Sequence, residues 1–393
     1  MPLSGNADLI TGDRRPPARP YTGWALEQAV NLDRDNPGLL AASFRYGHQR
    51  RQAMFLLMAL VEILGIDEIA NHLRSSAITP EFGDVTAPMV VGQTVLQVRR
   101  PRDLVRTILA GPPIGLLGAL DRIGPEPFGE PRTYYELCRL FLSRDPDDRR
   151  RAKVISQISG NLVGDQIRIV SMLDPVLLHP AFVATVYDVR QVAEIHNALA
   201  YVRQHCSGAT DEAIRASLGR IKPGGHRSEL IKGWAERFDR VPTMLDTRGD
   251  LTLRVIDSAT ALADAGRRFR NCLATKVFET VLGVYLYVEY EPIDPQEPGV
   301  IAELRRTNQG YVLEGLHATN NRRVLPHRAR LIRDKLAALG VAILAHAPGD
   351  RDAIHAAAQM LGEHKLMEAD CNGWGDELLP VEEDLEQLLA EAA

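Results

Sequence analysis

A cysteine preceded by three arginines is the residue most suited to chemistry in this sequence. Cys272 follows Arg267, Arg268 and Arg270 near the end of a predicted helix. Cations close to a thiol stabilise the thiolate and make it a better nucleophile. The alternative is that Cys272 packs between two helices, because free cysteine is among the most frequently buried residue types.

Five further polar residues lie near the ends of predicted strands and could complete a catalytic site. His317 could act as a base, and Asn320 or Asn321 could orient it, as in a Cys-His-Asn arrangement. Glu303 and Glu314 fall on two strands joined by a short turn, where they could form a carboxylate pair with one raised pKa. Both strands also alternate acids with apolar residues, which is typical of a sheet with one face in water, and this is the competing interpretation.

Six arginines around these positions suggest a second function, phosphate binding. They are Arg267, Arg268, Arg270, Arg322, Arg323 and Arg328. Arginine binds phosphate through a planar fork of donors, so such a surface would hold a nucleic acid in a salt-dependent manner. A solvated face explains the same residues without a ligand. Only six of the 46 basic residues in the chain are lysines, but the codon usage of a GC-rich genome is the simpler explanation of that excess of arginine.

The elements that must position these residues change in type along the chain. Residues 1–22 are polar and rich in proline and predict a disordered lead. Residues 23–245 have apolar residues at helical spacing with Pro and Gly breaks and no fixed repeat, which predicts an irregular helical domain. Residues 250–345 follow the order β-α-α-β-β-β-α-β and predict an α+β domain with a mostly antiparallel sheet.

The elements of the α+β domain can be assigned individually. Strands are predicted over residues 251–256, 284–290, 300–305, 311–317 and 341–345. A helix capped by Asp257 or Ser258 is predicted to run to Arg270, a short helix to end at Gly283, and a third to run from Pro326 to Leu339.

The last segment, residues 346–393, is predicted to be an acidic helical tail. An apolar stripe ends the chain, made of Val381, Leu385, Leu388, Leu389 and Ala392. Residues 363–393 carry ten acidic residues and one lysine, so the net charge of −5 for the whole chain comes from this tail. We expect the terminal helix to dock on the rest of the chain and cover an arginine-rich surface.

Composition excludes several classes of protein. With 393 residues, 45% hydrophobic and 25% charged, the chain is typical of a globular protein of two or three domains and not of a disordered, collagen-like or disulfide-rich one. The longest apolar run, residues 53–61, is about half of the ~20 residues a membrane span needs, so we expect a buried helix there and no membrane association. Four cysteines without a CxxC pair, and no signal peptide, predict a cytoplasmic protein with reduced thiols. No motif predicts a cofactor or a metal site.

The C-terminal third, about residues 250–345, resembles the PcfJ-like family of conjugative plasmids, phages and other mobile elements. The resemblance lies in an ordered series: Gly266 with Asn271-Cys272-Leu273, then Gly283-Val284-Tyr285-Leu286, Ala302-Glu303-Leu304, and Glu314-Gly315-Leu316-His317-Ala318-Thr319-Asn320-Asn321-Arg322. Glu314 stands where the family usually has Gln, and His317 where it usually has Gly. The resemblance therefore favours Cys272, Glu303 and Asn320 over His317 as site residues. The resemblance implies a mobile-element context and no particular reaction.

These observations leave three functions open. The first is a PcfJ-like protein with a polar catalytic site around Cys272, Glu303, Glu314, His317 and Asn320. The second is a nucleic-acid-binding accessory factor that uses the six arginines. The third is a helical adaptor that binds a protein partner, in which the α+β domain is only structural.

Overall fold

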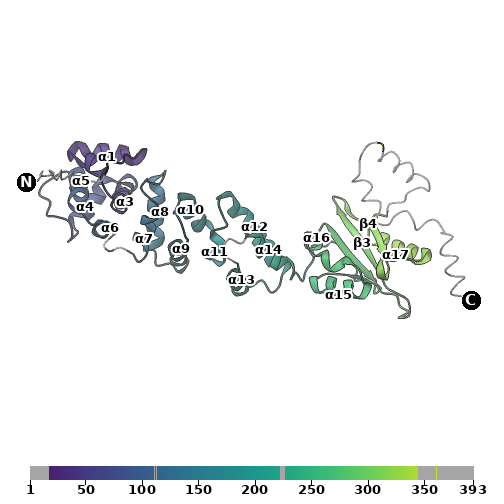
Figure 1. The fold of residues 1–393 in the computed structure, drawn as a ribbon. Helices are drawn as coiled ribbons and strands as arrows, with labels where there is room; N and C mark the ends of the chain where they lie inside the picture. The colour runs from purple at the N-terminus through teal and green to yellow at the C-terminus, as the bar shows by residue number, and fades with distance from the viewer. Residues whose placement is uncertain (1–16, 110, 112, 222–225, 344–359, 361–393) are drawn as a thin grey trace, which may run out of the picture. The chain divides into compact units, whose positions relative to one another are not determined.

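The computed structural model describes residues 17–109, 111, 113–221, 226–343 and 360, and Figure 1 shows their fold. The predicted acidic tail and its docking helix therefore lie outside the described residues, except for Met360. Of the predicted disordered lead, residues 17–22 are described, and there Tyr21 is buried and forms a hydrogen bond with Ser43 at 2.8 Å.

The chain divides into two compact units. Unit 1 comprises Met1–Asn197 and Ile214–Arg227, and unit 2 comprises Ala198–Ala213 and Ser228–Ala393. The sheet thus belongs to the same unit as several helical residues that the sequence pattern alone assigns to the preceding helical domain. The predicted fold class is confirmed: a helical N-terminal part is followed by an α+β region with an antiparallel sheet.

The part of the chain before the sheet is helical, as predicted. Its elements are α1 (Trp24–Asp35), α2 (Leu39–Ser43), α3 (His48–Leu64), α4 (Ile66–Arg74), α5 (Ala87–Gln97), α6 (Pro101–Leu109), α7 (Leu116–Asp121), α8 (Pro131–Leu142), α9 (Pro146–Gln157), α10 (Gly164–Met172), η1 (Pro175–Leu177), α11 (Pro180–Val183), α12 (Arg190–His205), α13 (Asp211–Leu218) and α14 (Ser228–Ala235).

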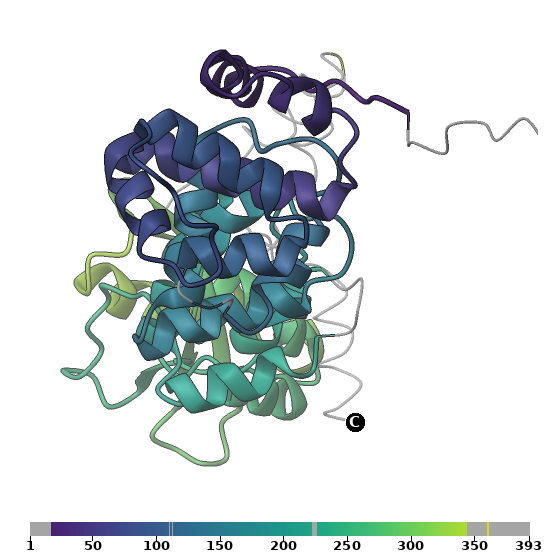
Figure 2. The same cartoon turned by 90° about the vertical axis from the view of Figure 1, so that its left-hand side faces the viewer.

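Helix α3 is the centre of the first part of unit 1. It contacts α1, α4, α6, α7 and α8. Figure 2 shows the N-terminal helices of unit 1 in purple and blue. Every residue from Arg51 to Val61 is buried, and residues 53–61 are all apolar, so this part of α3 is covered around its whole circumference. The prediction of a buried helix over residues 53–61 is confirmed. No helix within the described ranges is long and apolar enough to cross a membrane.

The sheet of unit 2 has four antiparallel strands in sequential order. They are β1 (Leu253–Val255), β2 (Tyr285–Tyr290), β3 (Val300–Thr307) and β4 (Gly310–His317). The predicted hairpin is confirmed, with Thr307 opposite Gly310. Of the predicted final strand over residues 341–345, the structure describes residues 341–343, where Ala342 forms a parallel bridge with hydrogen bonds of 2.8 and 3.0 Å to β4.

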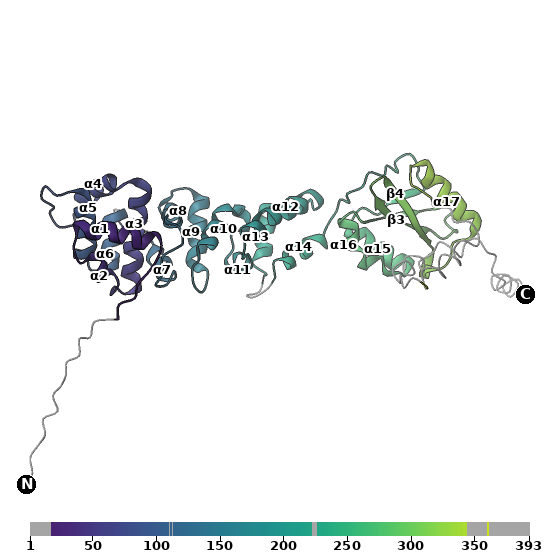
Figure 3. The ribbon, with the colours of Figure 1, turned by 90° about the horizontal axis from the view of Figure 1, so that it is seen from above.

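Helices cover both faces of this sheet. They are α15 (Ala259–Phe269), η2 (Cys272–Thr275), α16 (Val277–Val281), η3 (Thr319–Asn321) and α17 (Pro326–Ala338). One face packs on α17 in an apolar core that includes Val288, Ala302, Leu304, Ile332 and Leu336. Figures 1 and 3 show α15 and α16 on the other side of the sheet from α17.

Candidate functional site

The sheet face opposite α17 carries several of the polar side chains that the sequence predicts for the site. In the β2–β3 register Tyr287 lies opposite Glu303, and in the β3–β4 register Ile301 lies opposite His317. Because side chains alternate along a strand, Glu303 points away from the core that contains Ala302 and Leu304. Tyr287, Glu303 and His317 therefore share this face.

A β-bulge changes the position of Glu314. Leu304 pairs with Leu313 and Glu303 pairs with Gly315, so Glu314 is an extra residue without a partner on β3. Its carboxylate is bonded to Arg305 Nε. The predicted carboxylate pair is therefore not formed, since Glu303 and Glu314 take different partners.

Glu303 is the middle member of a group of polar side chains that we call the Tyr–Glu–His cluster: Tyr287, Glu303 and His317. The Tyr287 hydroxyl donates to Glu303 Oε1 at 2.9 Å, and His317 Nε2 lies 3.4 Å from Oε2. Burial alone would raise the pKa of Glu303, but the hydrogen bonds from His317 and Tyr287 outweigh it, and the pKa lies below its usual value. Burial, and then the Glu303 charge, raise the pKa of Tyr287. The cluster thus holds a carboxylate beside a neutral phenol.

This geometry suits proton transfer by His317. We assign the proton on Nε2 to the contact with Glu303, which leaves the Nδ1 lone pair to accept a proton. The side chains of His317 and Glu303 are 24% and 20% exposed, so a small molecule can reach them. A carboxylate that orients an imidazole and stabilises its charged form is the arrangement used by histidine bases in hydrolases. Lys276, the N-cap of α16, adds a positive charge that lowers the pKa of Glu303.

A second buried carboxylate on the same face was missed by sequence reasoning. Glu289 is 1% exposed and binds both Arg254, at 2.6 Å, and Arg268, at 2.7 Å. Burial would raise its pKa, but the two guanidinium groups hold it below the usual value. The sequence signal was an acid within an otherwise apolar and aromatic strand, Val284–Tyr290.

Cys272 is exposed on a tight turn, so the interpretation of this residue as buried packing is wrong. It opens η2, which Asn271 caps by accepting a hydrogen bond from the Leu273 backbone at 3.2 Å. Gly266 allows η2 to approach α15, because a Cβ there would lie 3.1 Å from the Ala274 nitrogen. Within the described part of the chain, no hydrogen bond or ion pair joins Cys272 to His317 or Glu303.

The two turns that bear Cys272 and Asn320, η2 and η3, contact the same helix, α15. Arg270, Asn320 and Asn321 have positive φ values of 49°, 59° and 56°, and they are the non-glycine residues with this conformation among those described. Such residues cost about 1–3 kcal/mol each and are concentrated at functional sites.

Acidic partners bind several of the predicted phosphate-binding arginines. Arg267 binds Asp264, and Arg268 binds Glu289. Arg328 is buried and binds Glu297 at 2.9 Å and the Pro298 carbonyl at 3.0 Å. The other three, Arg270, Arg322 and Arg323, are exposed. The six residues therefore do not form one continuous cationic surface.

The described residues contain no group of three or more His, Cys, Asp and Glu side chains that could hold a metal ion. Comparison with known proteins gives no relative: no protein family model, curated protein or solved structure matches this chain.

Proposed function

We propose that this chain is a PcfJ-like protein of plasmid or phage context whose α+β region performs acid–base catalysis. The observation that supports the proposal is the Tyr–Glu–His cluster, in which a carboxylate held by Tyr287 lies beside His317, and both side chains are partly exposed. The free thiols of Cys138, Cys206 and Cys272 are consistent with work in a reducing cytoplasm.

In this mechanism His317 takes the proton from a water or hydroxyl nucleophile. The Glu303 carboxylate stabilises the imidazolium that forms, and the Tyr287 hydroxyl fixes the carboxylate. The proton then passes from His317 to the leaving group, which restores the neutral imidazole. Cys272 and Asn320 lie on the turns η2 and η3, and we assign them to substrate contacts rather than to proton transfer.

The test is hydrolysis of chromogenic carboxylic esters, phosphomonoesters and phosphodiesters by the full chain. We expect His317→Gln to lower kcat by about 100-fold or more, the usual contribution of a general base. His327→Gln is the matched control, because His327 is an exposed histidine of the same unit. Glu303→Gln should also impair turnover, whereas Glu314→Gln, on the same sheet face but bonded to Arg305, should not. No turnover of any substrate class by the unmodified chain, or equal turnover by His317→Gln, contradicts the proposal.

The second candidate is a nucleic-acid-binding accessory factor, and one observation favours it. Arg270 and Arg322 are exposed and have no hydrogen bond or ion pair through their side chains to another described residue. If they bind phosphate, Arg270→Ala with Arg322→Ala should weaken binding of single- and double-stranded DNA at low salt and flatten its salt dependence. Arg267→Ala is the control, since Arg267 is paired with Asp264.

A further inference from the structure

A pocket with a basic rim lies within unit 1 and contains none of the residues discussed above. It has a volume of about 660 Å³ and is formed by one face of α9 and by the segment that runs from η1 into α11. Pockets of about 300–1,000 Å³ are the usual size for small-molecule sites. The site is therefore large enough for a metabolite-sized ligand.

Helical spacing places the α9 residues of the pocket on one face. Arg150, Lys153, Val154 and Gln157 are separated by three or four positions and all line it. Two cations three positions apart repel each other mildly. None of the lining residues, all of which the structure describes, is acidic, although the Asp147 carboxylate lies next to the rim, 3.5 Å from Arg150 Nη1.

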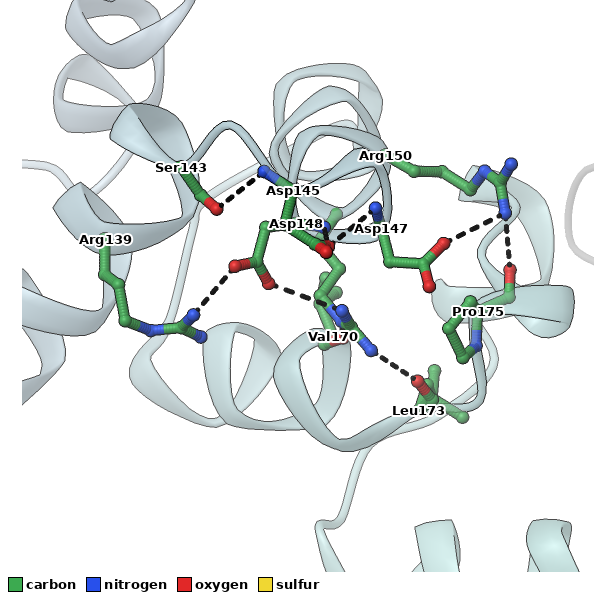
Figure 4. Close-up of polar contacts among 10 residues, drawn as sticks. Arg139, Ser143, Asp145, Asp147, Asp148, Arg150, Val170, Leu173 and Pro175 are labelled. Atoms are coloured by element: carbon green, nitrogen blue, oxygen red, sulfur yellow. Dashed lines mark hydrogen bonds and ion pairs between the residues drawn. The ribbon is translucent and has the colours of Figure 1, made fainter.

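The positions of the two cations leave donors for a ligand. Arg150 Nη1 lies 3.5 Å from the Asp147 carboxylate and donates to the Pro175 carbonyl at 3.4 Å, as Figure 4 shows. These contacts hold the guanidinium in place through one nitrogen, and Nε and Nη2 remain as donors. Lys153 is exposed and forms no hydrogen bond or ion pair with another described residue.

The opposite wall is mostly apolar and contains one histidine. Leu178, Ala181 and Ala184 line the pocket, and the two small alanines leave room for a flat ring. His179 also lines it, and its Nδ1 is buried without a hydrogen-bond partner. A buried N–H without an acceptor is rarer than an unsatisfied acceptor, so we assign the ring proton to Nε2, which becomes a third donor.

We propose that this pocket binds a small organic phosphomonoester. A phosphomonoester carries about −1.5 to −2 charges at pH 7 and three strong acceptor oxygens, so it can bind the free donors of Arg150 and Lys153 and the His179 ring together, whereas a carboxylate has two oxygens and a single charge. The phosphate lies between Arg150 and Lys153, and the ring of the ligand packs on Leu178 and Ala184. This site is independent of the proposed catalytic function, because none of its residues belongs to unit 2.

Isothermal titration of the full chain with AMP at low salt tests the proposal. We expect Lys153→Met to weaken AMP binding about tenfold or more, the effect of losing one charge-assisted hydrogen bond. Ala184→Trp should abolish binding by filling the pocket while it keeps both cations. Lys232→Met removes the same charge from an exposed lysine in unit 2 and should leave the affinity unchanged.

Two further ligands separate the contributions of charge and ring. Adenosine, which lacks the phosphate, and inorganic phosphate, which lacks the ring, should each bind at least about tenfold more weakly than AMP. The proposal is overturned if the unmodified chain does not bind AMP, if Lys153→Met binds it equally well, or if inorganic phosphate binds as tightly. Circular dichroism confirms that the variants fold, and the exposed Lys153→Met substitution keeps the test valid if Ala184→Trp does not.

Discussion

Two carboxylates on one sheet face, Glu289 and the partly exposed Glu303, are kept ionised by different means. Glu289 is held between Arg254 and Arg268, which are permanently charged, so this group is a fixed ion pair. Glu303 is held by a phenol and an imidazole, and a neutral imidazole has a nitrogen that can accept a proton. A guanidinium has no such acceptor, which is why we place the chemistry at Glu303 and not at Glu289.

The lowered pKa of Glu303 predicts a pH dependence of stability. Because its pKa in the folded chain is below the unfolded value of about 4.3, its stabilising contribution is complete above that value and is lost as the pH falls through the folded pKa. We expect the free energy of unfolding of Glu303→Gln to fall less than that of the unmodified chain as the pH is lowered below about 4.3. Urea unfolding between pH 3 and 7 measures this, with Glu236→Gln as an exposed control. Parallel profiles for the unmodified chain and Glu303→Gln would show that the carboxylate is not stabilised as described.

The cysteines predict a second result at the residue scale. Cys272 is exposed, whereas Cys138 and Cys206 are buried. Burial raises the pKa of the Cys138 thiol to about 12, and burial followed by the Asp239 charge raises that of Cys206. In a Cys371→Ser background, we expect one thiol to react rapidly with a disulfide reagent in the folded chain, and Cys272→Ser to remove that reaction. Rapid labelling that persists in the double variant would contradict the exposure of Cys272.

At the scale of elements, arginine side chains cap the C-terminal ends of helices in unit 1 by donating hydrogen bonds to their last carbonyls. Arg50, Arg122 and Arg151 each donate to two backbone carbonyls, at the ends of α5, α9 and α10 respectively. Figure 4 labels Val170 and Leu173, whose carbonyls accept from Arg151. The last carbonyls of a helix have no partner within it, and the arginine fork can satisfy two of them together. Part of the arginine excess thus serves the fold, which weakens the inference of a polyanion partner from composition.

Arg122 gives the clearest test of this structural role. Arg122→Met leaves the carbonyls of Ile155 and Ile158 without their donor, so we expect the free energy of unfolding to fall by about 1–3 kcal/mol. Arg132→Met, at a position where the side chain is 80% exposed, should change it by less than about 0.5 kcal/mol. Urea unfolding of the two variants measures the difference. Equal stability of the two variants would mean that the Arg122 bonds contribute nothing.

The elements of the α+β region could be predicted from the sequence, but the contacts of the site could not. Strands β2, β3 and β4 lie within two residues of their predicted ends, because apolar alternation and the turn at Thr307–Gly310 are local signals. The bulge at Glu314 depends on the register between β3 and β4, which one residue can shift, so the partners of Glu303 and Glu314 were not predictable. The pairing of Arg268 with Glu289 joins residues 21 positions apart, and no spacing rule covers such a pair.

For the whole molecule, the uneven distribution of charge along the chain predicts how strongly it would bind DNA. Residues 363–393 contain ten acidic residues and one lysine, so their formal net charge is −9. Because the whole chain has a net charge of −5, residues 1–362 together carry +4. We expect a chain that ends at residue 362 to bind DNA more tightly at low salt than the full chain, because the repulsion from the tail is gone. Mobility-shift titrations at several salt concentrations measure both affinities.

A second variant keeps the tail but carries Glu382→Gln, Glu383→Gln, Asp384→Asn and Glu386→Gln, and it separates the effect of charge from that of the apolar stripe. An affinity between those of the full and the truncated chain assigns the effect to charge. If truncation leaves the affinity unchanged, the tail does not shield the arginines, and the negative net charge has no bearing on what the rest of the chain binds.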